Sequence, residues 1–173
     1  MTYFQRFWAQ ISLLVLSVIG VGVSIYLAIQ HYKKAPVACS NSGIINCERV
    51  LNSVYGSLPH TNIPISIPGL LFFLVFACLA LLSWFVWPER KILVIGEVVL
   101  SGLGLLTVFY LVFVELVYLH NICEWCTSLH ITIFISLLIA VYQLLQLNAY
   151  EDNELEYEDD EAIAPVSTHG IQN

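Results

Sequence analysis

Four long apolar stretches constrain the fold of this chain more than any other feature of its sequence. They cover residues 7–29, 65–87, 92–119 and 122–147. A helix needs about 20 mostly apolar residues to cross the hydrocarbon of a bilayer, and each stretch is long enough. Of the 173 residues, 58% are hydrophobic and only 11% are charged, which excludes a typical water-soluble domain. We therefore predict an all-α integral membrane protein whose membrane domain covers residues 1–148.

The connections between the predicted spans differ greatly in length. Residues 30–64 join the first span to the second, whereas the other two connections are only a few residues long. Helices joined so tightly run antiparallel in a compact bundle. We therefore expect a polytopic four-helix bundle with a long surface loop between its first two helices. Because the number of spans is even, both termini lie on one face, and the first and third connections lie on the other.

The charge of the chain is concentrated near its C-terminus. Most of the net charge of −7 comes from one acidic run. Its members are Glu151, Asp152, Glu154, Glu156, Glu158, Asp159, Asp160 and Glu161. A block of like charge repels itself and is usually disordered, so we predict a disordered acidic tail over residues 149–173. The rest of the chain is nearly neutral, and we expect membrane lipid but no nucleic acid as a partner.

Four of the five cysteines lie in connections that open onto the same face. Cys39 and Cys47 belong to the long loop, and Cys123 and Cys126 open the fourth span. The positive-inside count is level, with three basic residues on each side, so charge does not orient the protein. Paired surface cysteines persist as disulfides outside the cytosol. We therefore place this face outside the cytosol and both termini inside it, and we assign Cys78, in the second span, only a packing role.

Cys123 and Cys126 form a CxxC motif, whose two thiols on one helical turn can close a strained, readily exchanged disulfide. We expect Asn121 to be the N-cap of the fourth helix and Glu124 to complete a capping box. Cys123 would then lie in the first turn, where unpaired backbone N–H groups stabilise a thiolate. The carboxylate of Glu124 acts in the opposite direction, because it raises the pKa of a thiol. A structural disulfide and half of a metal site remain open for this motif.

The long loop carries the second cysteine pair. Asn46 can cap a short helix that begins at Cys47. Its apolar face would consist of Val50, Leu51, Val54, Tyr55 and Leu58. Such an amphipathic helix suits the membrane interface. The alternative for Cys39 and Cys47 is a purely structural disulfide that holds the loop. A second dithiol on the same face favours a relay instead, in which each disulfide is passed on by thiolate attack.

A relay needs an electron acceptor, and the fourth helix suggests where it binds. Cys126 and His130 are four residues apart and share a face, with Phe134 close to the same stripe. An apolar pocket with one polar group beside a thiol suits a lipid-soluble quinone. A hydrogen-bonded core histidine is the open alternative for His130.

Two carboxylates fall within the third span. Glu97 and Glu115 are five helical turns apart and so project from one side of that helix. Ionisable groups inside a span usually face the interior. A role in proton supply and, for Glu115, a simple interfacial position both remain open.

Several elements of the sequence match a known pattern together. They are Cys39, Cys47 with Glu48 to Leu51, Ser53, Ile63 to Ser66 with Gly69, and the CxxC motif. In these elements the chain resembles the vitamin K epoxide reductase family, particularly its bacterial members, over about residues 10–145. It departs from the family pattern at His130, where animal members have tyrosine, and at Asn62, where glycine is usual.

The resemblance implies a quinone-linked thiol oxidoreductase. Cys123 and Cys126 would exchange with menaquinone or ubiquinone, Cys126 being the nearer, and Ser53 would help to hold or polarise the quinone. Cys39 with Cys47 would carry electrons in from a separate thioredoxin-like protein in the periplasm or cell exterior. The expected location is a bacterial inner (cytoplasmic) membrane.

We therefore predict an enzyme that oxidises a thioredoxin-like partner, reduces a membrane quinone and so supports disulfide formation in exported proteins. No metal is expected in this reading. Two alternatives stay open. One is a structural four-span protein with inert disulfides, and the other is a membrane protein that binds zinc through its four loop cysteines.

Overall fold

The structure is a computed structural model, and it describes residues 3–34, 36–40, 43–58, 61, 63–85 and 91–163. Four long helices form the body of the molecule. They are α1 (Tyr3–Lys33), α3 (Ser66–Phe85), α4 (Lys91–Phe113) and α5 (Glu124–Ile163). The segments long and apolar enough to cross a membrane are Phe7–Lys33, Ser66–Phe85, Lys91–Leu119 and Glu124–Asn153. Each of the four predicted spans falls on one of these segments, with boundaries that differ by a few residues; residues 86–87 lie outside the described part.

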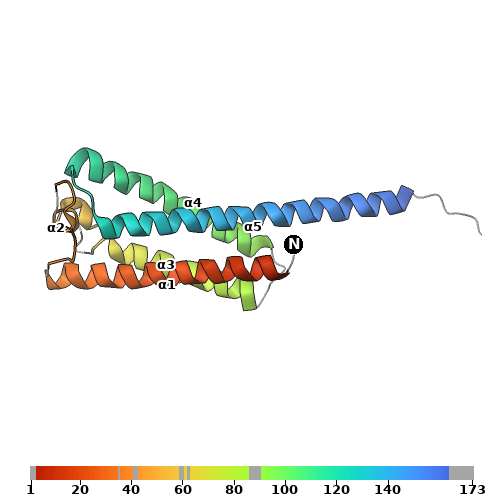
Figure 1. The fold of residues 1–173 in the computed structure, drawn as a ribbon, viewed down its shortest axis with the longest axis horizontal. Coiled ribbons are helices and arrows are strands. Elements are labelled where there is room, and N and C mark those ends of the chain that lie inside the picture. Colours follow the sequence, from red (N-terminus) through yellow and green to blue (C-terminus); the bar gives the residue numbers. More distant parts are fainter. Residues whose placement is uncertain are drawn as a thin grey trace, which may run out of the picture.

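The long helices pack as a closed bundle (Figure 1). α1 contacts α3 and α5, and α4 contacts the same two helices. The predicted all-α four-helix bundle is therefore confirmed. The short helix α2 (Cys47–Leu51) lies at one end of the bundle, and the N-terminus lies at the other.

The bundle has an apolar outside and a partly polar inside, as a lipid environment allows. Large apolar side chains such as Leu106 and Phe109 are exposed on its surface. Small polar side chains, among them Ser24 and Ser101, are fully buried. This arrangement reverses the pattern of a water-soluble protein and supports placement in a membrane.

Each long helix gives one side chain to a buried polar cluster at the end of the bundle opposite the four paired cysteines. The amide Nε2 of Gln10 donates to Oε1 of Gln143 at 2.9 Å and to Oγ of Ser83 at 3.2 Å. It also lies 3.4 Å from Oε2 of Glu97. Hydrogen bonds between helices help to hold membrane bundles together, so this cluster joins all four helices at that end.

Helix α5 extends well beyond the membrane segment. It continues to Ile163, so residues 149–163, predicted to be disordered, are helical; residues 164–173 lie outside the described part. A helix that already spans the membrane lengthens without a new nucleation step, and glutamate is a good helix former. Glu151, within this extension, forms an ion pair with Lys91 at the start of α4, with 2.5 Å between Oε2 and Nζ.

The long loop folds over the end of the bundle as α2 and a 3₁₀ turn, η1 (Val54–Gly56). Asn46 caps α2 as predicted, because its Oδ1 accepts the backbone N–H of Arg49 at 2.9 Å. The predicted continuation of this helix to Leu58 is wrong. Ser53 interrupts it, because its hydroxyl accepts the N–H of Gly56 at 3.2 Å and starts η1 instead.

Candidate active site

The two cysteine pairs are in different chemical states. Cys39 and Cys47 form a disulfide with an S–S distance of 2.05 Å, and we call them the outer pair. Cys123 and Cys126, the inner pair, are both free thiols. Within the outer pair, Cys39 is partly exposed and Cys47 is fully buried. The outer pair therefore has one sulfur within reach of solvent and one inside the protein.

The buried cysteine of the outer pair meets the inner pair. Cys47, Val50 and Cys123 form one buried cluster, against which Cys126 also packs. Both Cys47 and Cys123 have 0% exposed surface. The structure thus brings the four predicted redox cysteines together at one end of the bundle.

Main-chain hydrogen bonds hold the outer loop beside the CxxC motif. The N–H of Ile122 donates to the carbonyl of Ile44 at 2.9 Å, and the N–H of Asn46 donates to the carbonyl of Ile122 at 3.1 Å. Ile45 and Ile122 form an isolated parallel β-bridge. Because Cys47 and Cys123 directly follow these bonded residues, the backbone itself places them together.

The two middle residues of the CxxC motif hold the residues on either side of Cys39. The indole Nε1 of Trp125 donates to the carbonyl of Ala38 at 2.7 Å. The carboxylate of Glu124 accepts the N–H of Ser40 at 3.3 Å and also its hydroxyl. These contacts hold the loop segment that contains Cys39 against the CxxC motif. The sequence contained no signal for them beyond the identity of the two residues.

Helix α5 starts differently from the prediction. It begins at Glu124, and Cys123 precedes it. The Sγ of Cys123 accepts the N–H of Cys126 at 3.3 Å, as an N-cap side chain would. The predicted N-cap role of Asn121 is wrong, because its Nδ2 donates to the carbonyl of Leu119 at 2.6 Å.

Hydrogen bonds to sulfur favour the thiolate form of Cys123. The Cys126 thiol is the strongest of these donors, and the backbone N–H groups of Cys126 and Trp125 add to it. Together they lower the pKa of the Cys123 thiol, although burial and the charge of Glu115 act in the opposite direction. The carboxylate whose charge opposes thiolate formation at Cys123 is therefore Glu115, rather than Glu124 as the sequence predicts.

A cavity of about 290 Å³ lies between the helices, next to the inner pair. Cys126 and His130 form part of its wall, and the rest of the lining is mainly apolar, including Phe72, Leu103 and Ile133. The prediction that Cys126 and His130 share a pocket therefore agrees with the geometry. Phe134 does not line this cavity, because its side chain is 49% exposed on the outside of the bundle.

A second, smaller cavity of about 40 Å³ adjoins Cys126 on the side of the long loop. Its polar lining includes Ser53 and Glu115. The hydroxyl of Ser53 donates to the carbonyl of Val50 at 2.7 Å and accepts the N–H of Gly56. Ser53 thus lies near the inner pair, but its own proton is donated to the carbonyl of Val50 while its oxygen caps η1.

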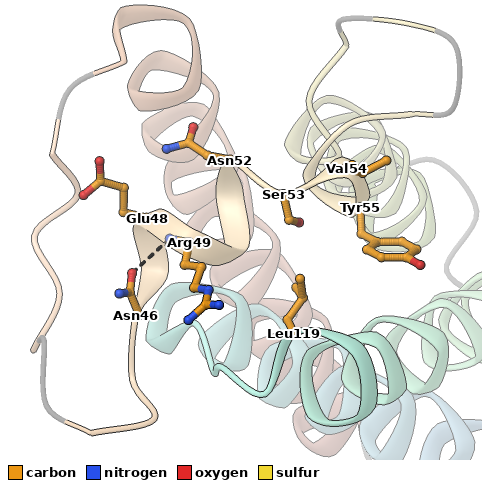
Figure 2. Close-up of a pocket in the computed structure, with 8 residues that line it drawn as sticks. All are labelled: Asn46, Glu48, Arg49, Asn52, Ser53, Val54, Tyr55 and Leu119. Carbon is orange, nitrogen blue, oxygen red and sulfur yellow. Dashed lines mark hydrogen bonds between the residues drawn. The ribbon is translucent and has the colours of Figure 1, made fainter.

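An open pocket of about 580 Å³ lies outside these cavities, between α2, η1 and the end of the third span (Figure 2). It shares Ser53, Tyr55 and Leu119 with the small cavity. The small cavity in turn shares Cys126 with the large one. The three hollows therefore lie in a row, with the small cavity between the open pocket and the large cavity.

Glu115 belongs to a turn that the sequence did not predict. The third span ends in a π-helical turn, η2 (Val114–Leu119), which follows α4 without a break. Glu115 is only 6% exposed, so its side chain faces the interior of the bundle, as expected for an ionisable group in a span. An evenly apolar run carries no pattern that distinguishes π-helix from α-helix.

The thiolate zinc site considered above has no support in the described part of the chain. No group of three or more His, Cys, Asp or Glu side chains there is arranged to hold a metal ion. The outer pair also has no thiolate to offer while its disulfide is closed.

Comparison with known proteins agrees with the cysteine geometry. No curated protein matches the chain in sequence. The sequence profile described as the vitamin K epoxide reductase family matches residues 11–141, which is well over half of the chain and includes both cysteine pairs. The chain therefore belongs to the vitamin K epoxide reductase family.

Proposed function

We propose that this membrane thiol–disulfide oxidoreductase carries electrons from a separate thioredoxin-like protein to a membrane quinone, and so supports disulfide formation in exported proteins. The membership of the family supports the reaction class. The proposed order of electron transfer through the cysteines rests on one observation. Cys47 is packed against Cys123 in a buried cluster, while Cys39 is partly exposed.

The exchange steps follow from this difference in exposure. A thiolate of the partner attacks the sulfur of Cys39, forms a mixed disulfide and releases Cys47 as a thiolate. The second thiol of the partner resolves the mixed disulfide, so the partner leaves oxidised and the outer pair is reduced. Cys47 then attacks Cys123 of the inner disulfide, and Cys39 closes the outer disulfide again, which leaves the inner pair reduced.

In the proposed cycle, an oxidised outer pair with a reduced inner pair, the combination present in this structure, would precede transfer to quinone. In this state the lowered pKa of Cys123 favours a thiolate, which is the form that closes a disulfide with Cys126.

The large cavity suits a quinone ring in its chemistry, and its volume is close to the lower limit for ligand pockets. Ligand pockets for small molecules usually measure about 300–1,000 Å³ and are mostly apolar with a few polar groups, and this one measures about 290 Å³. When bound, menaquinone or ubiquinone would accept two electrons and two protons. His130 would offer a hydrogen bond to the ring, and Cys126 would meet it from the wall of the cavity. We assign Ser53 an indirect role, through the small cavity.

The proposed setting is the cytoplasmic membrane of a bacterium. The outer pair would face the non-cytosolic side, where disulfides persist, and both termini would face the cytosol. The partner would then meet Cys39 in the periplasm or at the cell exterior.

The test combines complementation with a purified assay. Each of the four paired cysteines is changed to alanine in a cell that lacks its own disulfide-generating membrane oxidase, and disulfide formation in an exported reporter is measured. We expect every one of these variants to fail. The matched control is Cys78→Ala, because Cys78 is a free, exposed cysteine on α3 and should be dispensable.

The purified assay asks whether quinone is the acceptor. Protein in quinone-free lipid discs is mixed with a reduced thioredoxin-like protein, with and without added menaquinone. We expect one turnover at most without quinone and many turnovers with it. Equal rates in the two cases, or activity without Cys123 or Cys126, would overturn the proposed function.

A further inference from the structure

Glu115 is a buried acidic residue that the cysteine relay leaves unexplained. It lies inside a membrane-spanning segment and is 6% exposed. Ionisable side chains in such segments are energetically unfavourable and are usually found where they have a function. Glu115 also belongs to a π-helical turn, a distortion that occurs frequently at functional sites.

The chain that follows Glu115 fixes its carboxylate beside the inner pair. Its main-chain carbonyl accepts the N–H groups of His120 and Asn121, the latter at 3.2 Å. His120 has a left-handed backbone (φ 50°), which turns the chain directly toward the CxxC motif. The backbone N–H of Cys123 is then near enough to the carboxylate of Glu115 to stabilise its negative charge.

The small cavity connects the same carboxylate with the other thiol. Glu115, Cys126 and Ser53 all line this space of about 40 Å³. A site of that size, with polar groups around it, has room for about one water molecule. Glu115 therefore lies beside the backbone of Cys123 and shares a water-sized cavity with Cys126.

We propose that Glu115 is the proton carrier of the inner pair. When the inner disulfide is reduced, it takes up the proton that would otherwise protonate the Cys123 thiolate, and it releases this proton when the Cys123–Cys126 disulfide forms. This role rests on the proposed function, because it assumes that the inner pair passes electrons to a quinone.

The protons and electrons balance in this scheme. Before transfer, Cys123 is a thiolate, Cys126 is a thiol and Glu115 is a carboxylic acid. One S–S bond forms, two electrons pass to the quinone, and the protons of Cys126 and Glu115 accompany them, which yields quinol and a Glu115 carboxylate. When the outer dithiol reduces the inner disulfide again, one of its two protons returns to Cys126 and the other to Glu115.

Few other titratable groups face Glu115. Cys126 and Tyr55 of η1 line its cavity. The charge of Glu115 also acts on both thiols of the inner pair. Glu48 and Arg49 of α2 line the neighbouring open pocket rather than the small cavity. On the described elements packed around it, Glu115 is thus the carboxylate positioned to exchange a proton with the inner pair.

Infrared difference spectroscopy tests the proposal without quinone. Wild-type protein in quinone-free detergent is measured with the inner pair oxidised and then reduced by a stoichiometric dithiol. We expect a carboxylic-acid carbonyl band to appear on reduction. It should be absent in Glu115→Gln and present in Glu97→Gln, which alters a second buried glutamate of the same span, far from the cysteines. A spectrum without such a band in the wild type, or a band that survives in Glu115→Gln, would overturn the proposal.

Kinetics supply the second measurement. Glu115→Gln should slow the reduction of quinone by the inner dithiol about 100-fold, which is a typical contribution of a positioned acid or base. Glu115→Asp keeps an acid and should recover part of that rate, which a purely structural role would not explain. If the wild type reduces quinone but Glu115→Gln does so equally fast, the proton carrier is wrong and the relay stands. If the wild type fails to reduce quinone, the proposed function itself is wrong.

Discussion

Cys126 lies on the wall between two hollows with different chemistry. On one side is the small cavity with Ser53 and Glu115, and on the other is the larger apolar cavity with His130. Its thiol also hydrogen-bonds to the sulfur of Cys123. One side chain therefore influences the acidity of its neighbour and faces the proposed quinone site.

The first prediction concerns the acidity of Cys123. The Cys126 thiol is the largest of the contributions that lower the pKa of Cys123, so Cys126→Ala should raise this pKa. A higher pKa means less thiolate at a given pH, and the alkylation midpoint of Cys123 should move to higher pH. Below the midpoint, the rate at fixed pH should fall about tenfold for each unit of pKa. The measurement is the pH profile of iodoacetamide labelling in reduced protein, read by mass spectrometry of the Cys123 peptide.

Cys126→Ser is the matched control, because a hydroxyl in place of the thiol still donates a hydrogen bond. Its midpoint should lie between those of the wild type and Cys126→Ala. An unchanged profile in Cys126→Ala would show that the thiol does not set the acidity of Cys123.

At the scale of helices, the contact between α1 and α3 depends on a glycine. A Cβ placed on Gly20 would come within 2.4 Å of the ring of Phe73, which is itself buried. Overpacking of this kind usually destabilises a protein by about 1–3 kcal/mol. Gly20→Ala should therefore lower the thermal unfolding temperature in detergent.

Gly22→Ala provides a closely matched control for this second prediction. It lies on the same helix and has no atom within 4 Å of its added Cβ. Both variants gain the same helix propensity from alanine, so the difference between their unfolding temperatures isolates the contact with Phe73. Equal unfolding temperatures would contradict the packing described.

The helices also show which features could be predicted from the sequence. The four spans were predictable because membrane segments are set by length and hydrophobicity alone. The cap of α2 at Asn46 was predictable because it depends on a hydrogen bond three residues away. The helix extension to Ile163 was not predicted, because a composition argument for disorder ignores the span that already nucleates the helix.

The parts of the site that escaped prediction depend on contacts distant in sequence. Asn121 appeared to be an N-cap, but the fold uses Cys123 in that place. The hydrogen bond from Trp125 to the carbonyl of Ala38 joins residues 87 positions apart. The π-helical turn that carries Glu115 was not predicted either. The cysteines themselves were predictable, since their pairing on one face follows from counting spans.

At the scale of the whole molecule, the two ends of the bundle should face opposite sides of the membrane. A cysteine introduced at the exposed position Asn52, on the loop, should react with a membrane-impermeant maleimide in intact cells. Asn153→Cys, at the exposed far end of the α5 span, should react only after permeabilisation. Both changes are made in a background where the outer pair is replaced by serine. Labelling of Asn153→Cys in intact cells would contradict the proposed orientation.

The row of three hollows has a consequence for the energetics of turnover. The open pocket, Glu115 and the inner pair all lie at the same end of the bundle as the outer pair. Moving one charge across a membrane potential of 100 mV changes the free energy by about 2.3 kcal/mol. Because electrons and protons enter together from one side in the proposed scheme, no net charge crosses the bilayer, and oxidation of the partner is electroneutral and independent of the membrane voltage.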